Sequence, residues 1–237
     1  GTGYSDIYDN SILWTDALIG QLMDDLQELG LADRTLVVFA SDHGEAFGEH
    51  GGEGHARDVY GEVTETPWML FLPFRLERGI VVEEASTNVD LWPTLLDLLG
   101  LPGLDDPDGR SLVPAIEAAA TGEARGLPEE HMGFAQIDHA WGMLEAQDQP
   151  THVALTKDRW RLVYNGTRPG HLELFDKQED PTEQRNLARD RPEVAEDLMS
   201  DVTSYLERGD APWGGSPMIE IDEMELQQLR ALGYGVH

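Results

Sequence analysis

The chain has 237 residues, of which 16 are Lys or Arg and 46 are Asp or Glu, so its formal net charge is −30. This acidic excess argues against a nucleic-acid-binding protein or one that docks on anionic membranes, because both need a basic surface. The absence of cysteine excludes disulfides, cysteine zinc sites and a cysteine nucleophile within these residues. No apolar run reaches the roughly 18 residues that a membrane span requires.

The amino-terminal part predicts helices alternating with buried strands. Residues 8–29 carry apolar side chains at helical spacing and stop before Gly30. Residues 35–40 form a continuous apolar run that is typical of a strand covered on both faces in a parallel sheet, and residues 68–72 predict a second such strand. A further helix is expected over residues 89–99, where Asp90 and Pro93 suit a helix start. A short helix is expected after it, capped by Asp108 or Ser111 and running through residue 120.

The carboxyl-terminal part has a different pattern. Short apolar runs separated by turn residues, including the hairpin signal Asn165-Gly166, predict an antiparallel meander. Residues 192–206 predict an amphipathic helix packed on it, and residues 222–232 predict a last short helix. We therefore expect an α/β fold in three parts: a parallel-sheet core over residues 1–120, a connector with one weak strand over 121–150, and a small antiparallel α+β subdomain over 151–237.

Asp42 and His43 directly follow the first predicted strand. Ligands in open α/β sheets bind beyond the carboxyl ends of the strands. A carboxylate oxygen and an imidazole nitrogen both bind divalent cations. The same dipeptide recurs at Asp138-His139, but no strand or glycine-rich loop accompanies it there. The context therefore favours Asp42 and His43 as metal ligands.

The glycine-rich segment that follows, residues 42–60, is long for a connection and contains two further histidines, His50 and His55. They could be incidental residues of a solvated loop. They could complete a zinc site with His43. Alternatively, His55 and Arg57 could face an anionic substrate beside the metal, because so acidic a chain needs local positive charge to hold an anion. The sequence leaves these three interpretations open.

Four blocks of the sequence resemble the sulfatase family of the alkaline phosphatase superfamily, and they occur in the family's order. The blocks cover residues 35–60, 88–101, 108–112 and 172–187. The helix predicted over 8–29 is also similar to a family helix that lies past the nucleophile. The resemblance implies that the chain is the carboxyl-terminal portion of a sulfatase, with part of its alkaline-phosphatase-like core. Because the chain begins with Gly1 instead of Met, we also expect a fragment.

The resemblance implies roles for individual residues. Asp42 and His43 would bind a divalent metal ion, most often Ca²⁺ in the family, with Mn²⁺ or Mg²⁺ as alternatives because a histidine nitrogen is a softer donor. His55 would be a catalytic residue that contacts the sulfate ester. Arg57 is expected as a substrate-binding residue because of its positive charge, not because of the resemblance. The family's nucleophile is a formylglycine made from the first residue of a Cys/Ser-x-Pro-x-Arg motif, which these residues lack.

The missing motif implies that the amino-terminal half of the sulfatase domain is a required partner and that this chain alone is inactive. The resemblance also implies a periplasmic or secreted location. Two alternatives remain. One is a phosphodiesterase or phosphonate monoester hydrolase of the same superfamily, in which an Asp-His metal pair also occurs. The other is a non-catalytic metal-binding module, which the charge and the missing nucleophile would suit.

Overall fold

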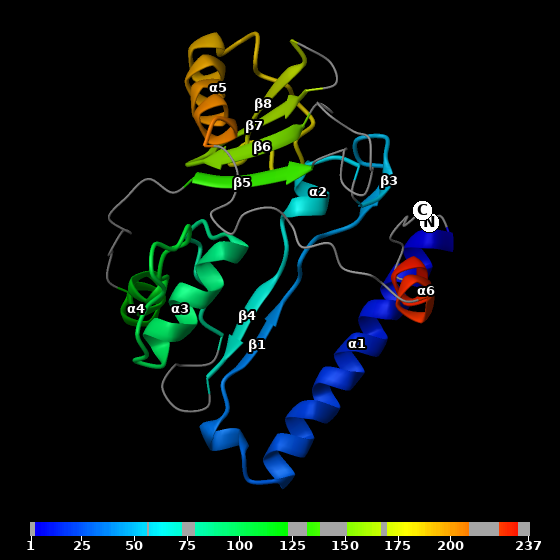
Figure 1. Ribbon diagram of the computed structural model, residues 1–237, viewed down its shortest axis with the longest axis vertical. Coiled ribbons are helices and arrows are strands. Elements are labelled where there is room, and N and C mark those ends of the chain that lie inside the picture. The colour runs from blue at the N-terminus through cyan, green and yellow to red at the C-terminus, as the bar shows by residue number, and fades with distance from the viewer. Residues whose placement is uncertain are drawn as a thin grey trace.

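The computed structural model describes residues 3–55, 57–72, 79–122, 132–137, 151–166, 170–208 and 223–231. It combines a long amino-terminal helix, a two-stranded ribbon, a group of short helices and a four-stranded sheet covered by a helix (Figure 1). The pair Asp138-His139 lies outside the described residues. In the described part of the chain, no helix is both long and apolar enough to cross a membrane.

Helix α1 (Gly3–Glu28) confirms the helix expected near the amino terminus and extends it backwards. It is followed by Gly30, at φ 66°, and by the short 3₁₀ helix η1 (Ala32–Arg34). None of the residues of α1 is buried. Large apolar side chains stay in contact with solvent, and Trp14 is 71% exposed and Leu18 is 61% exposed. The helical spacing was therefore predicted correctly, but the described residues of this chain leave the helix uncovered.

Strand β1 (Val37–Ala40) pairs with β4 (Trp68–Phe71) in antiparallel register, with Val37 opposite Phe71 and Ala40 opposite Trp68. The expected parallel sheet is therefore wrong for these two strands. A continuous apolar run indicates burial but does not fix strand direction. A parallel pair needs a long crossover, usually a helix of several turns. The connection between β1 and β4 holds only a small hairpin and one turn of helix, α2 (Gly61–Thr64).

The short helices form one group, shown in green in Figure 1. A 3₁₀ turn, η2 (Asn88–Asp90), leads into α3 (Leu91–Leu98), and α4 (Val113–Thr121) packs nearby. The buried Asp90 carboxylate accepts hydrogen bonds from the Thr87 backbone N–H at 2.8 Å, the Thr87 hydroxyl at 3.0 Å and the Arg110 N–H at 2.8 Å. The bond from the Thr87 backbone N–H, together with the Asp90 N–H donating to the Thr87 side chain, forms a capping box at the start of η2, which confirms the predicted role of Asp90 at a helix start.

The four-stranded sheet confirms the predicted antiparallel meander. Its order is β5-β6-β7-β8, and every neighbouring pair is antiparallel. The strands are β5 (Met132–Ile137), β6 (His152–Lys157), β7 (Trp160–Asn165) and β8 (Leu172–Asp176). Strand β5 is the weak strand expected within the connector. A turn follows β8, in which the Asp176 carboxylate accepts the Gln178 N–H at 3.2 Å.

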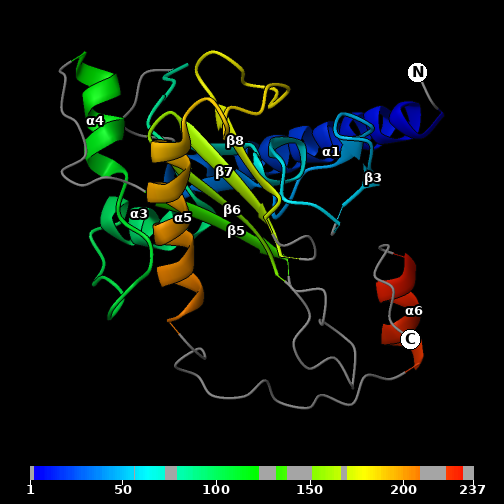
Figure 2. The same cartoon turned by 90° about the horizontal axis from the view of Figure 1, so that it is seen from above.

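Helix α5 (Pro192–Leu206) covers one face of this sheet, as Figure 2 shows from above. The main core lies between them and is built from fully buried side chains such as Leu155, Leu162, Leu174 and Val202. On the other face, Val59 and Tyr60 from the glycine-rich segment pack with Phe175. The last helix, α6 (Glu223–Ala231), ends the described chain. The sheet is therefore the platform against which the glycine-rich segment rests.

Candidate active site

The candidate site begins where β1 ends. The chain leaves the strand at Ser41 and turns back against α2, and the Gly44 N–H donates to the Val63 carbonyl at 2.9 Å. A Cβ atom at Gly44 would lie 2.2 Å from the backbone oxygen of Glu62. Only glycine allows the two backbones to come so close. This contact fixes where the neighbouring residues Asp42, His43 and Glu45 emerge.

Asp42 and His43 lie side by side in a geometry that suits a metal ion. The Nδ1 atom of His43 is 2.8 Å from the Gly44 carbonyl oxygen, which can only accept, so Nδ1 carries the hydrogen. The lone pair is then on Nε2, which lies 3.9 Å from Asp42 Oδ2. Two atoms at this separation can both reach one ion over bonds of about 2.0–2.6 Å. The Asp42 side chain is 78% exposed and open to further ligands.

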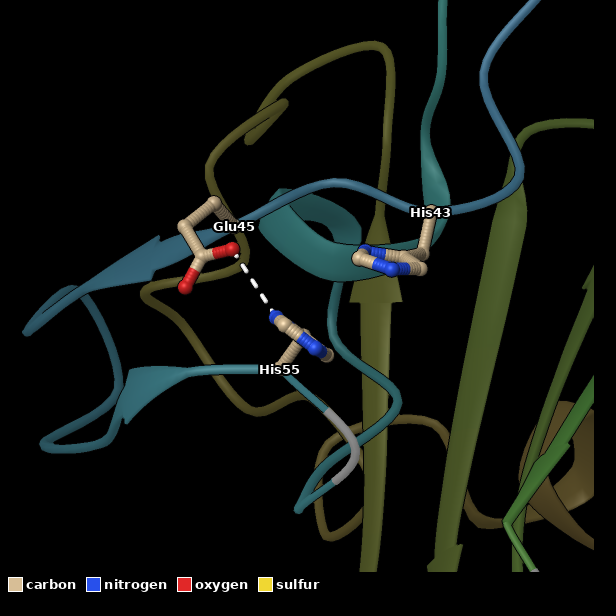
Figure 3. Close-up of side chains that lie close together, drawn as sticks. All are labelled: His43, Glu45 and His55. Carbon is tan, nitrogen blue, oxygen red and sulfur yellow. Dashed lines mark hydrogen bonds and ion pairs between the residues drawn. The ribbon is translucent and has the colours of Figure 1, made fainter. Parts of the chain in front are cut away.

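His55 lies next to His43, as expected for two residues of one site. Their rings stack with centroids 4.2 Å apart (Figure 3). His55 Nδ1 is 3.0 Å from Glu45 Oε2, the contact that the dashed line marks. His43, Glu45 and His55 each present a potential ligand atom, and these atoms all lie within 4.8 Å of one another. Glu45 is therefore a potential metal ligand beside His43 and His55.

Glu45 is held by two hydrogen bonds from distant parts of the chain. Besides His55, the hydroxyl of Tyr4 on α1 donates to Glu45 Oε1 at 2.6 Å. Burial by itself would raise the pKa of the Glu45 carboxyl, but the bonds from Tyr4 and His55 and the nearby histidines outweigh it, so the pKa is lowered. Glu45 is thus an ionised carboxylate that orients the His55 ring.

Sequence reasoning did not identify Glu45 or Tyr4. Glu45 immediately follows Asp42-His43-Gly44 in the most specific of the family-like blocks, so its position was a usable signal. Tyr4 had no such signal, because its contact with Glu45 joins residues 41 positions apart. Arg57 is exposed on the same loop as His55. The structure brings His43 and His55 together and adds Glu45 to them.

His50 does not belong to this group. Its two ring nitrogens lie 2.8 Å from Glu62 Oε1 and 2.9 Å from the Glu183 carbonyl oxygen, away from His43 and His55. The interpretation of His43, His50 and His55 as a three-histidine zinc site is therefore wrong.

Comparison with known proteins adds independent information. Residues 4–101 match the family described as Sulfatase. Arylsulfatase K of Bos taurus is 27% identical over 196 residues, which are 81% of this chain but only 34% of the arylsulfatase. The chain therefore spans about a third of the length of this curated relative.

Two solved structures resemble the fold. One is a protein in complex with its substrate D-glucosamine-2-N,6-O-disulfate, with a TM-score of 0.67 and 23% identity; the match covers 84% of this chain and 40% of that one. The other is the phosphonate monoester hydrolase of Agrobacterium radiobacter, with a TM-score of 0.58 and 26% identity over 80% of this chain and 38% of the hydrolase. The first, at its low identity, supports the fold alone.

Proposed function

Because residues 4–101 match the sulfatase family and the chain spans about a third of the arylsulfatase that it resembles, we propose that it is the carboxyl-terminal portion of a sulfuric ester hydrolase. In this proposal it supplies one side of a metal and sulfate site. One observation carries the proposal: the Asp42–His43 pair, with Nε2 of His43 turned to the carboxylate, lies directly beside the Glu45–His55 pair.

Asp42 and His43 would hold a divalent ion, with Ca²⁺ the first choice and Mn²⁺ or Mg²⁺ the alternatives. When bound, such an ion polarises sulfate oxygens and offsets negative charge in the transition state. The hydrogen bond from His43 Nδ1 to the Gly44 carbonyl, at 2.8 Å, holds the ring in the ligating orientation. The formal charge of −30 makes such a positive centre necessary for a sulfate to approach.

His55 would act on the substrate. Its Nδ1–H donates to the ionised Glu45 carboxylate, which fixes the ring and leaves Nε2 facing the sulfate ester. A histidine held in this way can hydrogen-bond a sulfate oxygen or protonate the leaving alcohol. Arg57, exposed on the same loop, would add positive charge at the entrance to the site. Glu45 is the orienting residue in this arrangement.

The remainder of the sulfatase domain would supply the formylglycine nucleophile and further metal ligands. Exposed apolar side chains on the described part of the chain support this partner, because a packed protein rarely leaves a long apolar face in water. They lie along α1, where Leu13 is 66% exposed, and on β4, where Met69 is 45% exposed. We propose that the missing part of the domain covers them, and that the complete protein is periplasmic or secreted.

The test uses the complete protein that contains this chain, assayed side by side on an aryl sulfate and an aryl phosphodiester. We expect the sulfate to be the better substrate, and Asp42→Asn to lower kcat/KM by at least about 100-fold. Asp33→Asn is the matched control, because Asp33 is exposed at the opposite end of β1 and loses the same charge. Equal activity of the two variants would refute the proposed metal site.

A second candidate function is phosphonate monoester or phosphodiester hydrolysis, which the 26% identical hydrolase structure favours. Preference for the aryl phosphodiester would select it. A non-catalytic module is the third candidate, and it would bind the metal without turnover in the complete protein. The isolated 237-residue chain is expected to be inactive, so turnover by this chain alone would contradict the shared-site proposal.

A further inference from the structure

His50 lies at the turn of a small hairpin whose open end carries the Glu45–His55 pair. The hairpin consists of β2 (Ala46–Phe47) and β3 (Glu53–Gly54), with Ala46 opposite Gly54. Glu45 immediately precedes β2 and His55 immediately follows β3. A contact that holds the turn of this hairpin therefore also restrains the two residues at its open end.

The contacts of His50 are made with two other parts of the chain. Its ring stacks on Tyr60, with centroids 3.9 Å apart and planes 6° from parallel. Nδ1 lies 2.8 Å from Glu62 Oε1, and Nε2 lies 2.9 Å from the backbone oxygen of Glu183, a residue 133 positions away. His50 thus joins the hairpin to α2 and to the turn after the four-stranded sheet.

Only a charged imidazole can donate to both hydrogen-bond partners at this position. A carboxylate oxygen and a backbone carbonyl oxygen both accept hydrogen bonds and cannot donate them. A neutral imidazole carries one N–H, so it satisfies one of these partners and turns a lone pair toward the other. The imidazolium form donates to both Glu62 and Glu183. Protonation of His50 therefore decides whether its ring donates one hydrogen bond or two.

Glu183 is itself firmly fixed, which makes it a suitable anchor. It is 2% exposed, and its φ of 58° places it in the left-handed region that residues other than glycine rarely adopt. Its carboxylate accepts the Gly61 N–H at 3.0 Å and a Lys177 hydrogen bond at 2.8 Å, and it pairs with Arg161 at 3.2 Å. These contacts hold the Glu183 backbone in this conformation, with its carbonyl directed at His50.

Arg161 extends the same connection. It is 4% exposed and lies on β7, and it donates to the Val59 carbonyl at 2.6 Å and to the Thr64 hydroxyl at 2.5 Å. Arg161 on the sheet therefore hydrogen-bonds to both ends of the segment from Val59 to Thr64. This segment contains Tyr60, on which His50 stacks. His50 links the turn of the hairpin to this assembly.

We propose that His50, as an imidazolium, is a positioning residue that anchors the turn of the β2–β3 hairpin to Glu62 and Glu183 and so fixes Glu45 and His55 beside His43. That the fixed pair acts on a sulfate ester rests on the proposed function. The anchoring itself is a property of this chain and can be measured without any substrate.

The charges around His50 favour its protonated form. Burial alone would lower the pKa of His50, but the bonds to the Glu183 carbonyl and the Glu62 carboxylate, with the negative charges of both residues, raise it. Tyr60 beneath the ring stays neutral, because burial and its hydrogen bond to Glu173 raise its pKa strongly. The charged groups facing His50 or its partners are Glu62, Glu183, Glu173, Glu65, Lys177 and Arg161.

The sign of the pH effect follows. Since the pKa of His50 is raised on folding, the anchoring is complete below the pKa of an ordinary histidine, about 6.5. It is lost as the pH rises through the folded value above that. Alkaline pH should therefore loosen the hairpin before it affects the core of the four-stranded sheet.

The experiment is amide hydrogen exchange on the full chain, followed by mass spectrometry over residues 46–54. At pH 6, His50→Gln should speed exchange in the hairpin by about tenfold or more, with no change in β6 and β7. As the pH is raised, hairpin exchange in the wild type should become as fast as in His50→Gln, once the rates are corrected for the intrinsic pH dependence of amide exchange. His171→Gln is the matched control, because His171 is exposed. Unchanged hairpin exchange in His50→Gln would overturn the proposal.

A second variant tests the proposal in case His50→Gln fails to fold. Glu62→Gln keeps the side-chain shape and removes one charge that favours the imidazolium, so it should lower the pH at which the hairpin loosens. An unchanged transition pH in Glu62→Gln would also overturn the proposal. In the complete protein, His50→Gln should lower kcat more than it raises KM. If exchange responds as expected but the wild-type protein has no sulfatase activity, the proposed function fails and the anchoring stands.

Discussion

Replacement of Gly44 by alanine should destabilise the turn that carries the candidate metal ligands. The new Cβ would lie 2.2 Å from the Glu62 carbonyl oxygen and 3.2 Å from the Cα of Val63. Both atoms belong to the backbone, so no side chain can rotate away to make room. Overpacking of this kind costs about 1–3 kcal/mol. Separation of the two segments also weakens the 2.9 Å bond from Gly44 N–H to the Val63 carbonyl, which contributes about 1 kcal/mol.

The expected loss is therefore about 2–4 kcal/mol, which for a chain of this length lowers Tm by roughly 4–16 °C. Thermal unfolding followed by circular dichroism measures it. Gly52→Ala is the matched control in the same loop, because its Cβ would meet only a side-chain oxygen of Asp58 at 4.0 Å. If Gly44→Ala and Gly52→Ala unfold at the same temperature, close backbone contact is not what positions Asp42 and His43.

Two further predictions concern buried and bridging polar groups. Asp90→Ala should cost about 2–4 kcal/mol in the free energy of unfolding by urea, because it removes the acceptor of three hydrogen bonds; the exposed Asp97→Ala should cost less than about 1 kcal/mol. Tyr4→Phe should raise the pKa of Glu45 toward its ordinary value in a carboxyl NMR titration, whereas Tyr8→Phe should not. The lowered pKa of Glu45 stabilises the fold above the ordinary carboxyl pKa, and this stabilisation is lost as the pH falls through the folded value. In Tyr4→Phe the stabilisation should therefore be smaller, and its loss on acidification should be complete at a higher pH. Equal costs for the two aspartates, or an unmoved Glu45 titration, would contradict these assignments.

Much of the secondary structure could be predicted from the sequence, because its signals are local. The spacing of apolar residues in α1 and α5 and the turn residues between β7 and β8 act over a few neighbouring positions. The start of η2, which leads into α3, is similarly local, since Thr87 and Asp90 form its capping box within one turn. The direction of β4 relative to β1 could not be predicted from neighbouring residues. It depended on the connection from β1, whose short elements turn the chain back instead of carrying it across a sheet.

In the candidate site, too, some residues could be predicted from local sequence and others could not. Asp42 and His43 adjoin one predicted strand, so their chemistry and their position could be read from consecutive residues. The stacking of His43 with His55 needed the hairpin between them, and the Tyr4–Glu45 and His50–Glu183 contacts join residues 41 and 133 positions apart. Contacts of this kind depend on which surfaces meet in the folded chain, and apolar periodicity carries no information about them.

Several properties of this chain were readable before its structure: it is acidic and free of cysteine, it carries an Asp-His pair after a predicted strand, and it lacks the nucleophile motif of the family that it resembles. Those properties depend on residue identity and order alone. The tertiary structure decided that Glu45 orients His55, that His50 lies apart from the other two histidines, and that α1 keeps its apolar side chains exposed. Each of these depends on the distance between segments, and folding alone sets that distance.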